Sequence, residues 1–139
     1  ELIAADSNIC RNYKLLTSIK GVGPITAIVM LCSTLNFTKI TDHRKFACYC
    51  GLAPFEHSSG TSVRGGCHTS SMANRDIKVQ LNRSALIAIR CDPQLKAYYE
   101  RKVAEGKHKF SVLNAVRAKI AARCFAVVRR GTPYVALQI

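Results

Sequence analysis

The sequence predicts an all-α domain, and three observations favour that fold class. Apolar residues recur three or four positions apart over most of the chain, which is the spacing of one face of an α-helix. Residues that start and stop helices stand at the ends of these periodic segments. The alternating pattern of β-strands has little support, and the one place where a short β-hairpin fits is His57 to Arg64, in a serine-containing loop. Helices therefore account for the predicted core.

The N-terminal part of the chain predicts two helices joined by a glycine turn. Residues 2–19 contain neither proline nor glycine and have an amphipathic pattern, so we expect one unbroken helix there. Gly21 and Gly23 form a tight turn, and a second helix over residues 24–34 begins with proline. This arrangement resembles a helix-hairpin-helix element, whose backbone N–H groups approach a DNA phosphate closely. We predict phosphate contacts at Lys20 and at both glycines, with a compact turn between packed helices as the equal alternative.

The rest of the chain carries start and stop signals for four further helices. Asp42 is a good N-cap and Gly51 a good terminator, and the Asp92-Pro93 pair and Gly106 have the same roles further on. The corresponding helices are predicted over residues 42–50, from Ser70 or Ser71 to about Ile89, over 92–106, and over about 110–129. No internal repeat or low-complexity tract divides them. One helical domain is therefore expected.

Basic residues are concentrated in the second part of the chain. The whole sequence has 21 Lys or Arg and 8 Asp or Glu, a formal charge of +13. Residues 1–60 hold 6 basic and 4 acidic side chains, whereas residues 61–139 hold 15 and 4. Solubility does not require so large an excess of one sign, so we expect a polyanionic partner, DNA or RNA. The predicted contacts on the helices are Arg75, Lys78, Arg83, Arg117, Lys119 and Arg123.

The cysteines indicate neither a disulfide framework nor a metal site. Their number, seven, is odd, and no Cys-x-x-Cys pair occurs. Cys48 and Cys50 are two positions apart, which on a helix points them in different directions. We expect most of the thiols to be buried in a reducing compartment and predict no metal or other cofactor in this chain. No signal peptide is visible and the apolar run from Ile25 to Cys32 is too short to span a bilayer, so a cytoplasmic location without membrane contact is predicted.

The loop from Gly51 to Gly66 is the best candidate for chemistry. Several glycines and a proline interrupt regular structure there, so the backbone can expose the hydroxyls of Ser58 and Ser59. A serine that attacks a DNA phosphate forms a covalent phosphoserine link, and Arg64 is a local cation that could hold the phosphate. The alternative for this loop alone is a polar surface turn.

Four short segments, in order, carry a family resemblance. They are Ile19–Ala27, Phe46–Pro54, Ser58–Gly60 and Ser70–Asn74, and the sequence Arg-Arg-Gly-Thr-Pro-Tyr134 follows them near the end. Together they resemble the C-terminal domain of the insertion-sequence one-ten, one-sixteen and nine-oh-two transposases, from about Asn12 to Tyr134. Ser59 stands at the serine of the family's Ser-Gly pattern.

The resemblance implies a DNA recombinase that moves an insertion sequence, in which Ser59 is the nucleophile and Ser58 the second choice. It implies a longer protein, with a ribonuclease-H-like domain whose carboxylates bind a divalent metal such as Mg²⁺, a guide or bridging RNA, and a homo-oligomer. The chain begins without Met or a cap signal, so we expect residues 1–18 to end a linker or coiled-coil helix and residues 19–139 to form the C-terminal transposase domain. A non-catalytic nucleic-acid-binding module is the alternative function.

Overall fold

The structure is a computed structural model that describes residues 2–52 and 72–136, and it confirms the all-α class. Within these residues the secondary structure is helical and no strand occurs. The His57 to Arg64 hairpin lies outside the described residues. The helices are α1 (Leu2–Ala5), α2 (Ser7–Thr17), α3 (Pro24–Ser33), α4 (His43–Tyr49), α5 (Met72–Cys91), α6 (Pro93–Ala104) and α7 (Lys109–Arg130).

The predicted single helix over residues 2–19 is wrong, because the chain breaks at Asp6. Asp6 has extended backbone angles, and its carboxylate accepts hydrogen bonds from the N–H groups of Asn8 (2.8 Å) and Ile9 (3.2 Å). An aspartate in this position is an N-cap, so the second helix starts after it. The capped helix α2 places Leu15 and Leu16 in the core. The domain boundary proposed near residue 18 stays a prediction, although α2 packs with the helices that follow it.

The other predicted helix ends are confirmed to within two residues, except the start of α5, because Ser70 and Ser71 lie outside the described residues. Pro24 is at the start of α3, and the Asp42 carboxylate caps α4 by accepting from the Arg44 N–H at 2.9 Å. Gly51, with a φ of 66°, ends α4: the N–H of Gly51 donates to the Cys48 carbonyl at 3.1 Å and that of Leu52 to the Ala47 carbonyl at 2.8 Å. This pair of bonds is a Schellman motif, which needs a left-handed residue.

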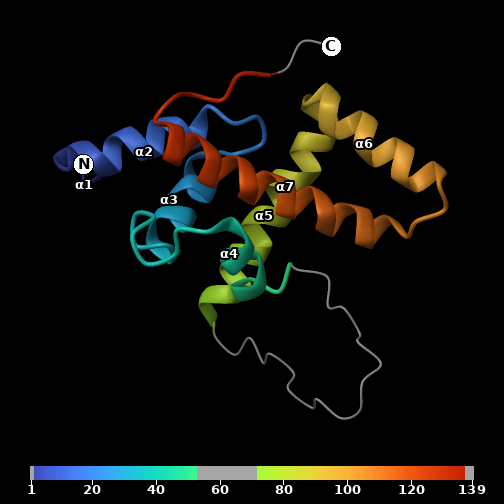
Figure 1. Cartoon of the computed structure of the whole chain (residues 1–139), viewed down its shortest axis with the longest axis horizontal. Helices are drawn as coiled ribbons and strands as arrows, with labels where there is room; N and C mark the ends of the chain where they lie inside the picture. Colours follow the sequence, from blue (N-terminus) through green and yellow to red (C-terminus); the bar gives the residue numbers. More distant parts are fainter. Residues whose placement is uncertain (1, 53–71, 137–139) are drawn as a thin grey trace.

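Helix α7 is the centre of the fold. Figure 1 shows it running through the middle of the molecule, with α5 crossing it and α6 folding back alongside its N-terminal half. The apolar residues of α7 that recur at helical spacing are buried: Val112, Leu113, Val116, Ile120 and Phe125. The Phe125 ring lies 4.9 Å from that of Phe37 and 5.4 Å from that of Phe46, centroid to centroid. Helices α2, α4, α5 and α6 all pack on α7. Helix α7 is therefore covered on several sides, and the groups described for the other helices are positioned relative to it.

The prediction that most cysteines are buried is wrong for the six that the structure describes. Only Cys50 and Cys124 are buried, and burial raises the pKa of each thiol to about 12. Cys48 is exposed and Cys50 is buried, so the prediction that these two thiols point in different directions is confirmed. Among the helices of the described part, none has the length and apolar character that a bilayer span requires.

Candidate nucleic-acid interface

The serine loop is attached to the core through a well-packed residue. Ser58, Ser59 and Arg64 lie outside the described residues, but Leu52, just before the gap, is 1% exposed. Its carbonyl oxygen accepts a hydrogen bond from Asn114 Nδ2 of α7 at 2.9 Å. The N-terminal end of the loop is therefore fixed against α7.

Helix α5 brings one predicted cation, Lys78, to the start of the serine loop and places another, Arg75, just after the undescribed residues. Arg75 is exposed in the first turn of α5, directly after the gap. The half-buried Lys78 lies against Gly51, since a Cβ built on that glycine would be 3.0 Å from Lys78 Nζ. The Lys78 ammonium also lowers the pKa of Cys50, although by less than burial raises it. Positive charge therefore lies beside the start of the loop.

Arg117 is directed into the protein rather than to the surface. Its Nη2 donates to Asn82 Oδ1 of α5 at 2.7 Å, and burial lowers the pKa of the guanidinium below its usual value. Its Nε is buried and has no hydrogen-bond partner among the described residues. Arg83 is exposed on α5. Arg117 therefore does not share the groove-facing side of α7 with Lys119 and Arg123. Nucleic-acid contact by any of these predicted side chains stays a prediction.

The glycine turn between α2 and α3 packs against α5. Gly21 has a φ of 95°, and a Cβ on it would lie 2.7 Å from the Ser84 carbonyl oxygen and 3.0 Å from the Ala88 Cβ. Gly23 caps α3 and has open space at its Cβ position, and Lys20 is exposed. Close packing alone therefore explains the glycine at position 21. Phosphate binding by Lys20, Gly21 and Gly23 stays a prediction.

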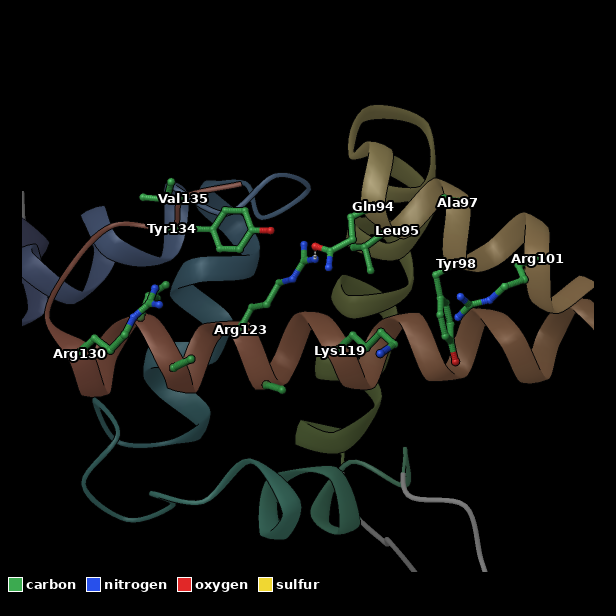
Figure 2. A pocket seen from close by; sticks show the side chains of 13 residues that line it. Gln94, Leu95, Ala97, Tyr98, Arg101, Lys119, Arg123, Arg130, Tyr134 and Val135 are labelled. Carbon is green, nitrogen blue, oxygen red and sulfur yellow. Dashed lines mark hydrogen bonds between the residues drawn. The ribbon is translucent and has the colours of Figure 1, made fainter. Parts of the chain in front are cut away.

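A groove of about 820 Å³ lies between α6, α7 and the segment that follows α7. Figure 2 shows basic and aromatic side chains from these three elements around it. The basic side chains are those of Arg101, Lys119, Arg123 and Arg130, and the aromatic ones are those of Tyr98 and Tyr134. No acidic residue is among the described residues that line it. The groove therefore combines positive charge with aromatic surface.

An ion pair holds the Arg123 side chain in the lining of this groove. Arg123 Nη1 donates to Asp92 Oδ2 at 2.7 Å and Arg123 Nη2 to Gln94 Oε1 at 2.8 Å. The Asp92 side chain is 2% exposed and that of Arg123 15%. The guanidinium also lies 4.8 Å from the centroid of the Tyr134 ring. The charge of Arg123 is thus already neutralised by Asp92. Its contacts connect the start of α6, helix α7 and the segment that follows α7.

Tyr98 lies between two other cations of the groove. Lys119 Nζ is 4.6 Å and the Arg101 guanidinium carbon 5.7 Å from the centroid of its ring, both within cation–π distance. Figure 2 shows these three side chains meeting at one end of the groove. The Arg101 charge is partly compensated by Glu105, 4.0 Å away and exposed.

Of the side chains that line this groove, the sequence predicted two as nucleic-acid contacts, Lys119 and Arg123. Arg130 follows them on the same face of α7, because intervals of four and seven residues bring side chains back to one side of a helix. The sequence therefore contains the signal that places Arg130 beside the other two. It contains no signal that places Tyr98 and Tyr134 in the groove, because their position depends on how α6 and residues 131–136 fold back on α7.

Metal ligands do not gather in this part of the chain. No three His, Cys, Asp or Glu side chains come together among residues 2–52 and 72–136. This part of the chain therefore brings no such cluster together for the divalent metal that the family resemblance implies.

Comparison with known proteins identifies the family. Residues 13–100 match the family described as Transposase IS116/IS110/IS902. The chain is 39% identical over 120 residues to an uncharacterized 43.6 kDa protein of insertion element IS110 from Streptomyces coelicolor, covering 86% of this chain and 29% of that protein. It is 24% identical over 135 residues to a pilin gene-inverting protein of Moraxella bovis, covering 96% and 42%. It is 30% identical over 112 residues to an uncharacterized 42 kDa protein of insertion element IS900 from Mycobacterium paratuberculosis, covering 79% and 28%.

The chain spans less than half the length of each of these relatives. The matched residues include the glycine turn, α4 and the start of α6, together with the serine loop. The resemblance predicted from four short segments is confirmed, and the chain belongs to the transposase IS116/IS110/IS902 family.

Proposed function

We propose that this chain supplies the nucleophile of a DNA transposase or site-specific recombinase, and that the nucleophile is Ser59. The observation that carries the proposal is the family match over residues 13–100, a range that contains the serine loop. A relative over nearly the whole chain is named a pilin gene-inverting protein, and inversion of a gene requires cutting and rejoining of DNA. The formal charge of +13 supports a nucleic-acid substrate.

The proposed chemistry is a pair of transesterifications. The Ser59 oxygen attacks a phosphodiester phosphorus, a serine–phosphate bond forms, the bond to one sugar oxygen breaks, and that oxygen leaves as a hydroxyl. The serine proton must pass to a base or to solvent. An incoming DNA hydroxyl then attacks the same phosphorus and releases the serine, so the bond energy is kept throughout.

The geometry at the ends of the loop supports this role. Leu52 is held by Asn114, Lys78 lies against Gly51, and Arg75 is exposed one turn earlier on α5, so a phosphate near the start of the loop would meet positive charge. Such charge stabilises the additional negative charge of a phosphoryl transition state. From the family resemblance we further propose that carboxylates elsewhere in the full-length protein hold any catalytic metal, that a guide RNA takes part, and that the full-length protein acts as a homo-oligomer.

The test is to trap the covalent intermediate. Full-length protein is incubated with a DNA substrate nicked so that the cut strand cannot be rejoined, and mass spectrometry then locates the adduct. We expect it on the peptide that contains Ser59. The Ser59→Ala variant should lose adduct and strand exchange while keeping its fold and its DNA binding, because a loop hydroxyl contributes little to the core.

Ser58→Ala is the matched control, since it removes an identical hydroxyl one residue away, and it should have the milder effect. An adduct on another peptide, or undiminished exchange by Ser59→Ala, would remove Ser59 from the mechanism. Binding without any adduct would favour the second candidate, a non-catalytic nucleic-acid-binding module. The cationic and aromatic groove is the observation that favours it.

A further inference from the structure

We propose that the groove between α6 and α7 binds an unpaired nucleic-acid strand, holding its phosphates with Lys119 and Arg130 and stacking its bases on Tyr98 and Tyr134. This inference goes beyond the serine chemistry and does not depend on it. It rests on the lining of the groove, which provides both kinds of side chain that such a strand requires.

The charge available to a ligand comes mainly from Lys119 and Arg130. Arg123 is paired with Asp92 and is nearly buried, so it neither needs nor easily reaches another anion. Neither Lys119 nor Arg130 has a carboxylate within 4.0 Å in the described part of the chain, and both are exposed. Two uncompensated cations on one groove favour a ligand with more than one phosphate.

The spacing of these cations fits a chain of phosphates better than one small anion. Lys119 and Arg130 are eleven residues apart on α7, which is about 16 Å along the helix axis. A single phosphate cannot contact two side chains so far apart without drawing both toward it. Successive phosphates of one strand can contact them in turn.

The aromatic rings distinguish an unpaired strand from a duplex. Tyr98 and Tyr134 are half-buried and line the groove. A base that stacks on Tyr98 takes the place of Lys119 or Arg101 over its ring, and the exposed cation then turns to the phosphates of the same strand. The Tyr134 ring is held by Arg123 and by the backbone, since its N–H donates to Ser18 Oγ at 2.9 Å. Bases of a duplex are stacked on one another and have no free face, whereas unpaired bases can stack on aromatic side chains.

The test compares variants inside the groove with matched variants just outside it. Fluorescence anisotropy of the purified chain is measured with labelled oligothymidylate, oligouridylate and duplex DNA, over a series of salt concentrations. The groove variants are Tyr98→Leu, Lys119→Gln and Arg130→Gln. The controls remove the same groups from positions that do not line the groove: Tyr99→Leu, Lys96→Gln and Arg129→Gln.

We expect Tyr98→Leu to weaken binding of the single strands roughly tenfold and to change duplex binding little, since one stacked base is lost. Lys119→Gln and Arg130→Gln should each reduce the slope of log affinity against log salt by about 0.7 on single strands. The controls should behave as the unchanged protein. The better of the two single strands identifies the ligand as DNA or RNA.

Equal losses in groove and control variants would overturn the proposal in favour of diffuse surface charge. An unchanged single-strand affinity in Tyr98→Leu, or tighter binding of duplex than of either single strand, would overturn it as well. Circular dichroism melting verifies folding, and the two charge variants alter exposed side chains, so they keep the test valid if Tyr98→Leu is unstable. Ser59→Ala should bind these strands normally, so failure of the serine mechanism and failure of the groove are separable.

Discussion

Replacing Asp92 should destabilise the fold far more than replacing the other two capping aspartates that the structure describes. Asp92 Oδ1 accepts from the N–H groups of Gln94 at 2.9 Å and Leu95 at 3.3 Å, while Oδ2 pairs with Arg123. Asp92→Ala loses the cap, which costs about 1 kcal/mol. It also leaves the charge of Arg123, whose side chain is only 15% exposed, without its carboxylate partner. Breaking this pair should cost about 3 kcal/mol, the low end for a buried ion pair, because the hydrogen bond from Arg123 to Gln94 remains.

The expected total, about 4 kcal/mol, is a large share of the roughly 5–15 kcal/mol typical of a domain. Asp6→Ala and Asp42→Ala are the controls: each removes a cap that is exposed and has no ion pair in the described part of the chain, so each should cost about 1 kcal/mol. Urea unfolding, followed by circular dichroism, measures all three free energies. If Asp92→Ala costs no more than these controls, the ion pair does not stabilise the protein and the reasoning fails.

The same carboxylate predicts a pH dependence. Burial raises the pKa of the Asp92 carboxyl. Hydrogen bonds from Arg123, Leu95 and Gln94, together with the Arg123 charge, lower this pKa by more than burial raises it, so the net pKa is below its usual value. A lowered folded-state pKa stabilises the protein above the unfolded value, about 3.9, and the contribution is lost as pH falls through the folded pKa. The stability difference between the unchanged protein and Asp92→Asn should therefore be constant near neutral pH and shrink in acid. A difference that grows in acid would contradict the assignment.

Two further predictions concern packing. Gly21→Ala should cost about 2 kcal/mol or more in urea unfolding, because it combines a positive φ with a Cβ that meets the Ser84 carbonyl. Gly106→Ala, with a φ of 89° but open space, should cost less, and equal costs would mean that the contact with α5 is not tight. Cys50 and Cys124 should react with a thiol reagent at neutral pH only on unfolding, since burial raises each pKa to about 12. Fast labelling of either in the native state would refute their burial; the thiols expected to react first are Cys32, Cys48 and Cys91.

Local signals in the sequence predicted most of the helices, because caps and glycine terminators act through neighbouring backbone. Asp42, Gly51 and Gly106 have the roles expected of them. Asp6 has the same chemistry, but the apolar pattern across it suggested continuity, and its cap was overlooked. The left-handed turn Leu35–Phe37 contains no glycine. Contacts between distant residues hold it: Phe37 packs on Phe125, and Asn12 Nδ2 donates to Asn36 Oδ1 at 2.8 Å.

The candidate sites divide in the same way. The serine loop was recognised from its residue types and order, which need no tertiary information. Helical periodicity predicts which cations lie off the apolar face of a helix, but it does not show which of them contacts a buried neighbour on another helix. Arg117 turns to Asn82 and Arg123 to Asp92 because α5 and α6 pack beside them. The aromatic half of the groove depends on the same packing and was missed for that reason.

The position of the groove on α7 limits what it can do. Asn114, which holds the start of the serine loop, and Lys119, which lines the groove, are five residues apart on one helix. Five residues turn the chain about 140° around the helix axis and advance it about 7.5 Å. The two side chains therefore leave α7 on different faces, and a strand in the groove would pass around the helix to reach the point where the loop begins. The groove and the start of the loop are therefore separate places on α7, so variants in the groove should weaken binding without altering the position of any covalent adduct.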